Sequence, residues 1–175
     1  MIEIHGKREC PYSWRVRLCA REKGLPYEWI PCDVPDPDPR AAQRNPERKS
    51  PKLWDDGFEL VESHVILQYL DEAHPGAPLQ PLGARARAQM RLRTCQLEGF
   101  ETYPLDETKV VYAFGVLERA LADGRAFLGG NGPDLSDISV WPFLAALEKF
   151  PRGKRAQEYW NRVRERDSLV ATRPH

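Results

Sequence analysis

The sequence has little that would mark it for a membrane, for secretion or for nucleic acid. Its 26 basic and 26 acidic side chains give a formal net charge of zero, so no overall field attracts nucleic acid or an anionic lipid surface. No apolar run approaches the roughly 20 residues that span a bilayer. The first residues also lack the charged, then apolar pattern of a signal peptide. We therefore expect a cytoplasmic protein without nucleic-acid or membrane partners.

Metal-binding and disulfide patterns are missing as well. The four cysteines form no CxxC pair and no zinc-ligand spacing, so the sequence predicts no metal. In a reducing compartment they are expected to be free thiols. Cys19, Cys32 and Cys95 fall within apolar or helical segments, where a cysteine usually serves as a small packing residue. Cys10 differs because it stands just before a helix.

The stretch Cys10-Pro11-Tyr12-Ser13 follows a short strand expected at residues 2–4 and opens a helix expected over residues 11–23. Pro11 suits the first helical turn, which does not need its missing N–H. The unpaired N–H groups and the dipole at a helix N-terminus favour an anion. The sequence therefore predicts a reactive Cys10 thiolate, and the alternative is an inert, half-buried cysteine.

Ser13 stands where a CxxC motif would have its second cysteine. A Cys10 thiolate would thus lack an internal resolving thiol, and a second thiol molecule would have to resolve its mixed disulfide. Ser13 could also donate a hydrogen bond to the thiolate, or be an ordinary first-turn residue. Arg15 and Arg17 are predicted to be surface or domain-contact charges without a catalytic part.

Turn and linker signals divide the chain into two parts. An Asp56-Gly57 turn between two apolar runs predicts a hairpin, and the Pro- and Gly-rich stretch 76–83 predicts a linker. The first part is predicted to be β-α-β-α-β-β-α, with elements near residues 2–4, 11–23, 27–32, 40–44, 49–54, 58–61 and 63–73. The second part is predicted to be helical, near residues 85–100, 105–121, 134–151 and 155–166, before a loose tail over residues 171–175.

At this point the sequence resembles the cytosolic glutathione transferases, and in particular their cysteine-type members. Residues 10–13 are similar to the site of omega-class transferases and dehydroascorbate reductases, and residues 13–17 to the SWRVR run of the zeta class. Ser50-Pro51 resembles the family's Val-Pro, Glu62-Ser63 its Glu-Ser pair, and residues 134–137 its buried helix-capping box. The resemblance implies a thioredoxin-like domain over residues 1–76 and a helical domain over residues 84–170.

The resemblance also implies a binding site for glutathione as cosubstrate. Ser50 and a cis Pro51 would pair with its peptide part, and Glu62 and Ser63 would hold its γ-glutamyl end. Lys49 would meet the glycyl carboxylate. The alternatives for these residues are an ordinary loop proline, a simple helix cap and a solvated surface lysine. Ser50 departs from the bulky aliphatic residue that the family usually has there.

The expected function is a glutathione-dependent transferase whose Cys10 thiolate attacks a disulfide or an electrophilic small molecule. Thiol transfer, deglutathionylation and glutathione conjugation are its candidate reactions. The rivals are a non-catalytic interaction module of the same fold and a pathway-specific isomerase or dehalogenase. The predicted helices between residues 83 and 121 are shorter than in the family, which implies an open pocket for the second substrate. A homodimer is a further expectation from the family.

Overall fold

The computed structural model describes residues 1–102, 104–147 and 153–174. The chain forms two compact units, and each is described by itself. The first contains Met1–Ala77 together with the chain end from Ala171, and the second contains Pro78–Val170. Among the described residues, no helix is long and apolar enough to cross a membrane.

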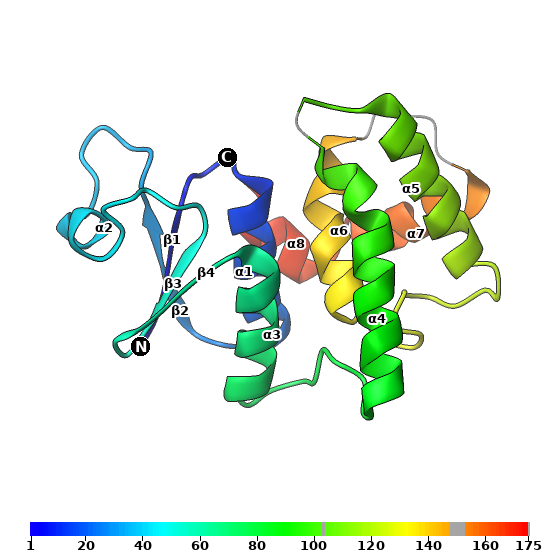
Figure 1. Cartoon of the computed structure of the whole chain (residues 1–175), viewed down its shortest axis with the longest axis horizontal. Helices are drawn as coiled ribbons and strands as arrows, with labels where there is room; N and C mark the ends of the chain where they lie inside the picture. Colours follow the sequence, from blue (N-terminus) through cyan, green and yellow to red (C-terminus); the bar gives the residue numbers. More distant parts are fainter. Residues whose placement is uncertain (103, 148–152, 175) are drawn as a thin grey trace. The chain divides into compact units, whose positions relative to one another are not determined.

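The first unit is built on one four-stranded sheet with the strand order β2-β1-β3-β4 (Figure 1). β1 (Ile2–Gly6) runs parallel to β2 (Tyr27–Pro31) and antiparallel to β3 (Lys52–Asp55), which in turn pairs with β4 (Phe58–Val61). The predicted order β-α-β-α-β-β-α is confirmed. The turn at Asp56-Gly57 joins β3 to β4 because both residues have positive φ angles, 46° and 96°.

Helices cover both faces of this sheet (Figure 1). α1 (Pro11–Glu22) and α3 (Ser63–Ala73) pack together on one face, and the short α2 (Pro39–Arg44) lies on the other. The alternation in β1 sends Ile2 and Ile4 to one face and Glu3 and His5 to the opposite one. All four of these side chains are buried, so β1 has an apolar face and a polar face, neither of which is solvated.

The second unit is helical, as predicted. Its core is formed by large side chains that include the fully buried Trp141, Trp160 and Tyr159. Its helices are α4 (Ala84–Leu97), the 3₁₀ helix η1 (Glu98–Glu101), α5 (Glu107–Ala120), α6 (Leu135–Ala146), α7 (Lys154–Val163) and α8 (Asp167–Thr172), the last of which runs into the chain end. The end predicted near Pro151 for the α6 segment lies outside the described residues.

The start of α6 carries the predicted capping box. The Asp134 side chain accepts from the N–H groups of Ser136 and Asp137, and the Asp137 side chain accepts from the N–H of Asp134. Asp137 also accepts from the N–H groups of Leu128 and Gly129 and from the Tyr159 hydroxyl, at 2.8, 2.9 and 2.6 Å. One buried carboxylate therefore fixes a helix start, the loop before it and α7.

The predicted loose tail is wrong for the described part of the chain end. Residues 171 and 172 belong to α8, and Thr172 is buried. The Thr172 hydroxyl accepts a 2.9 Å hydrogen bond from the indole N–H of Trp14 in α1. A long-range hydrogen bond thus helps to anchor a segment whose local sequence carries no strong helix signal.

Candidate active site at the sheet edge

The strand register brings the predicted site residues to one edge of the sheet. His5 pairs with Lys52 and Lys52 pairs with Val61. The end of β1, the start of β3 and the end of β4 therefore lie side by side. Pro51 directly precedes Lys52, and Glu62 directly follows Val61. The loop from β1 to Cys10 leaves the sheet at the same edge.

Cys10 is the N-cap residue of α1, with Pro11 in the first turn. Its backbone carbonyl accepts the 2.9 Å hydrogen bond from the N–H of Trp14 that begins the helix. The thiol is half-buried, and its sulfur lies 3.6 Å from the carbonyl oxygen of Ser50. The structure therefore brings the predicted nucleophile against the backbone that was predicted to hold glutathione.

The Ser13 hydroxyl is directed at Ser50. The two hydroxyl oxygens lie 2.8 Å apart, and Ser50 Oγ also accepts from the N–H of Lys7 at 2.9 Å. A Cβ atom at Gly6 would lie only 2.2 Å from Ser13 Oγ, so this packing requires glycine there. The Ser50–Pro51 peptide is cis, as the resemblance implies. Ser13 thus positions the Ser50 loop.

Glu62 and Ser63 form the start of α3. Glu62 has a φ angle of 67°, a conformation that L residues adopt at a cost and that clusters at functional positions. Its carbonyl accepts from the N–H groups of Val65 and Ile66, both at 2.9 Å. Ser63 is buried, and its hydroxyl accepts from Arg15 Nε at 3.0 Å.

Of the two alternatives predicted for Arg15, a surface or a domain-contact charge, the surface charge is wrong. Its side chain is among the largest fully buried ones. Its guanidinium donates to Ser63 Oγ, lies 3.1 Å from His64 Nε2 and stacks 5.0 Å from the centre of the Tyr12 ring. A buried cation therefore supports the start of α3, where helix N–H groups already favour a carboxylate.

Arg17 is also buried, which rules out the surface alternative for this residue too. Its guanidinium stacks 4.5 Å above the Trp29 ring. Within the described part of the chain, its Nε and Nη2 atoms have no hydrogen-bond partner. Burial lowers the pKa of Arg17, while the anionic forms of Tyr27 and Cys10 act in the opposite direction. Sequence reasoning missed this residue because an arginine in a helix usually reaches solvent.

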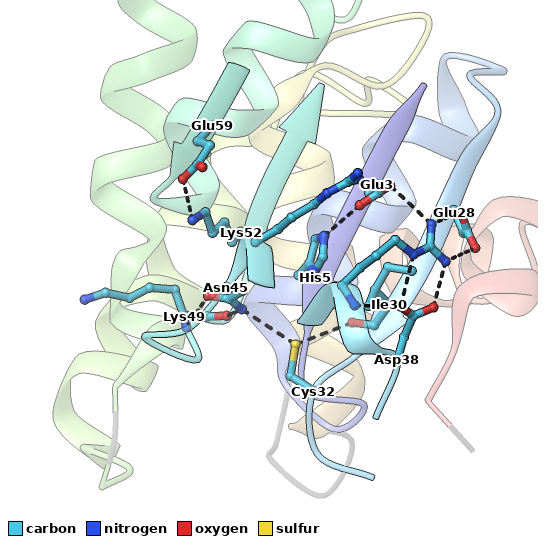
Figure 2. A network of polar contacts seen from close by, with 12 residues as sticks. Glu3, His5, Glu28, Ile30, Cys32, Asp38, Asn45, Lys49, Lys52 and Glu59 are labelled. Carbon is cyan, nitrogen blue, oxygen red and sulfur yellow. Dashed lines mark hydrogen bonds and ion pairs between the residues drawn. The ribbon is translucent and has the colours of Figure 1, made fainter. Parts of the chain in front are cut away.

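Lys49 lies on a cleft of about 380 Å³ beside the Ser50 loop. Its backbone is fixed by Asn45, whose side chain accepts from the Lys49 N–H at 2.9 Å and donates to the Lys49 carbonyl at 2.8 Å. Figure 2 shows the Lys49 side chain extending away from the polar network behind it. Arg44, Lys52, Glu47 and Glu59 also line this cleft, so its border carries three cationic and two acidic side chains.

Cys19, Cys95 and His74 take no part in the contacts described above, whereas Cys32 Sγ accepts from Asn45 Nδ2 at 3.6 Å. Cys19 is buried, and burial raises the pKa of its thiol. Cys95 is exposed, so its prediction as a packing residue is wrong. His74 lies 2.8 Å from an Asp55 carboxylate oxygen. In the part of the chain that the structure describes, no group of three or more His, Cys, Asp or Glu side chains is placed to hold a metal ion.

The fold and the edge site together define a class, namely a thioredoxin-like domain followed by a helical domain. The sequence matches the family model of the glutathione S-transferase N-terminal domain over residues 4–78. It matches that of the glutathione S-transferase C-terminal domain over residues 101–168. The chain belongs to the glutathione S-transferase family.

Individual relatives agree with this assignment. Glutathione S-transferase U1 of Arabidopsis thaliana is 33% identical over 164 residues, which cover 83% of this chain and 72% of that protein. Glutathione S-transferase omega-1 of Mus musculus is 27% identical over 84% of this chain and 67% of that protein. The crystal structure of rice GST1 in complex with glutathione superposes with a TM-score of 0.79 at 28% identity, covering 99% and 92% of the two chains. The chain is therefore a glutathione transferase-like enzyme.

Proposed function

We propose that this enzyme is a cysteine-type glutathione transferase that moves glutathionyl groups through Cys10. The observation that carries the proposal is the half-buried Cys10 thiol at the start of α1, 3.6 Å from the Ser50 carbonyl oxygen. A serine or tyrosine in this place would activate the thiol of glutathione. A cysteine can itself form the covalent intermediate.

The binding of glutathione is proposed to follow the sheet edge. The Ser50 backbone would pair with its peptide part like an added strand. The N–H groups at the start of α3, with Ser63 and Arg15 beneath them, would receive the γ-glutamyl carboxylate. Glu62 would accept from the ammonium group. The cleft bordered by Lys49 would receive the glycyl carboxylate.

In this arrangement the binding of glutathione is coupled to the deprotonation of the Cys10 thiol. In the free protein the Cys10 S–H donates to the Ser50 carbonyl, and a thiolate cannot donate. Strand-like pairing gives that carbonyl a new donor, the peptide N–H of glutathione. The bound peptide thus takes over the acceptor that the protonated thiol uses, and this favours the thiolate.

The proposed reaction has two balanced steps. The Cys10 thiolate attacks the glutathionyl sulfur of a mixed disulfide, the old S–S bond breaks, and the other thiol leaves as a thiolate that takes a proton from water. A glutathione thiolate then attacks the Cys10–glutathione disulfide, which releases oxidised glutathione and restores the Cys10 thiolate. Ser13 provides no resolving thiol, so the second glutathione is required.

The Ser63→Ala variant tests the glutathione site. We expect its dissociation constant for glutathione, measured by isothermal calorimetry, to rise about tenfold, because one hydroxyl ligand of the carboxylate is lost and Arg15 loses an acceptor. Ser139→Ala is the matched control, since the buried Ser139 hydroxyl donates a hydrogen bond to the Leu135 carbonyl inside α6, in the helical unit. Undetectable binding of millimolar glutathione to the unmodified enzyme would contradict the proposal.

We propose that Arg17 acts as the counter-ion of the Cys10 thiolate, because it is a buried cation two turns further along the same helix and two of its nitrogens have no hydrogen-bond partner among the described residues. The Arg17→Met variant keeps the length of the side chain and removes the charge. We expect Cys10 of this variant to react with iodoacetamide at pH 7 about tenfold more slowly, because the buried guanidinium that stabilises the thiolate has been removed. Arg21→Met is the control, as Arg21 is exposed one turn further along α1. An unchanged alkylation rate in Arg17→Met would refute this role.

A further inference from the structure

A buried carboxylate joins the central strand to α2. Glu3 in β1 is only 5% exposed. Its Oε1 accepts from Arg44 Nη1 and, at 3.2 Å, from Arg40 Nη1, and its Oε2 lies 3.0 Å from His5 Nε2. Figure 2 shows Glu3 and His5 side by side in this network. We call Glu3, His5, Arg40 and Arg44 the Glu3 clamp.

The clamp attaches the arginines of α2 to the sheet through a buried carboxylate. α2 has six residues, of which only Ala41 is buried. So short a helix is not stable without tertiary contacts. Arg40 donates to Glu28 at 2.7 and 2.6 Å and to Asp38 at 2.7 Å, and both carboxylates are partly exposed. Arg44 stacks 4.6 Å above the Trp54 ring. Glu3 is the one buried carboxylate among these partners.

The position of α2 is passed on to the site through Asn45. This residue ends the helix, is fully buried, and binds both backbone groups of Lys49. The next residue is Ser50, whose carbonyl contacts Cys10 and whose hydroxyl contacts Ser13. A continuous series of hydrogen bonds and chain neighbours therefore runs from Glu3 through Arg44 and Asn45 to the loop at Cys10.

We propose that Glu3 is a positioning residue for glutathione binding, which acts by holding α2 and hence the loop over residues 45–50 in its binding shape. This inference rests on the proposed glutathione site. On this proposal the polar face of β1 supports the glutathione site from a distance, through α2. The clamp makes glutathione affinity depend on the ionised state of Glu3.

The charged groups around the clamp fix the direction of its pH dependence. Burial raises the pKa of Glu3, but hydrogen bonds from Arg44 and His5 outweigh it and leave the pKa below its ordinary value. Burial lowers the pKa of His5 against the pull of Glu3, and Arg44 and Lys52 lower it further. Glu28 and Asp38 face the same arginines. The clamp is therefore intact at neutral pH.

Acidification weakens the clamp in two ways. The contribution of Glu3 is complete above the ordinary pKa of a glutamic acid and is lost as the pH falls through its lowered value. The contribution of neutral His5 is complete above the ordinary pKa of histidine and is likewise lost as the pH falls. We expect glutathione affinity to decline in acid together with the order of α2.

The Glu3→Gln variant tests the proposal, with Glu28→Gln as the matched control because Glu28 meets Arg40 from an exposed position. The readouts are the glutathione dissociation constant, KM and kcat with the mixed disulfide of cysteine and glutathione, and hydrogen exchange of the Lys49 amide. Glu3→Gln should raise KM and the dissociation constant about tenfold, leave kcat within about twofold, and speed Lys49 exchange about tenfold. Glu28→Gln should change none of them beyond about twofold.

A double-mutant comparison separates positioning from general destabilisation. Asn45→Ala breaks the link to Lys49 beyond the clamp, so adding Glu3→Gln to it should weaken glutathione binding little further. If Glu3→Gln does not fold, Glu3→Asp, which keeps the charge but shortens the side chain away from α2, replaces it in the same measurements. Unchanged glutathione affinity and unchanged Lys49 exchange in the clamp variant would overturn the proposal. A wild-type enzyme that binds no glutathione would instead refute the proposed function, while faster Lys49 exchange in Glu3→Gln would still support the clamp.

Discussion

Replacing Cys10 with serine is expected to lower glutathione-dependent thiol transfer at least about 100-fold, since a serine hydroxyl is not ionised at neutral pH and forms no disulfide. We propose the Cys10 sulfur as the reacting atom because Cys10 lies at the helix start and against Ser50. Glutathione binding should change by less than about threefold, because the proposed contacts to glutathione come from Ser50, Glu62 and Ser63. Rates with the mixed disulfide of cysteine and glutathione, and calorimetry with glutathione, measure the two quantities.

The matched control is Cys95→Ser. Cys95 is exposed in α4 and is the thiol with the freest access to a disulfide in solution. The variant should keep its thiol-transfer rate within about twofold. The outcome that contradicts the mechanism is full thiol transfer in Cys10→Ser, and a large loss in Cys95→Ser would move the nucleophile to α4.

The second large effect is expected in the helical unit. Asp137→Ala should lower the free energy of unfolding by at least about 3 kcal/mol, because it leaves three backbone N–H groups, two of them buried, and the buried Tyr159 hydroxyl without their acceptor. Tyr159 in turn accepts from the indole N–H of Trp141 at 2.7 Å. The loss should therefore spread from the helix start into the core, and denaturation followed by tryptophan fluorescence measures it.

Asp106→Ala is the control for this effect. Asp106 caps α5 by one exposed hydrogen bond, to the N–H of Lys109. Its removal should cost only about 1 kcal/mol. Equal effects of the two substitutions would show that Asp137 acts as a simple cap, contrary to the role assigned to it here.

Much of the fold could be predicted from local signals. The Asp56-Gly57 turn, Pro11 at the start of α1 and the box at Asp134 each determine a conformation through nearby atoms. The order of elements in the first unit follows from such signals, and so does the capping box. These features are short-range, and a single sequence carries them completely.

The buried charges could not be predicted in the same way. The alternation of Ile2, Glu3, Ile4 and His5 predicts one polar face for β1, and a polar face usually meets water. Only the tertiary structure shows that α2 covers it with arginines. The burial of Arg15 and Arg17 could not be predicted for the same reason, since a charged residue on a helix is rarely fully buried unless residues distant in the sequence compensate its charge.

The candidate site likewise contains residues that the sequence could identify and contacts that it could not. The sequence identified Cys10, Ser50, Pro51, Glu62 and Ser63 through their resemblance to a family, and the structure brings them to one sheet edge. It could not show that the Ser13 hydroxyl meets Ser50, or that Arg15 lies beneath Ser63. Both contacts join residues that are more than thirty positions apart, and no local pattern encodes them.

The most direct test of the account is to find where glutathione becomes attached. The enzyme is incubated with oxidised glutathione at neutral pH, its remaining thiols are blocked, and its peptides are analysed by mass spectrometry. The account predicts one glutathionyl group, on the peptide that contains Cys10, which reduced glutathione then removes. A protein that turns over mixed disulfides while its adduct lies on Cys32 or Cys95, and never on Cys10, would contradict it.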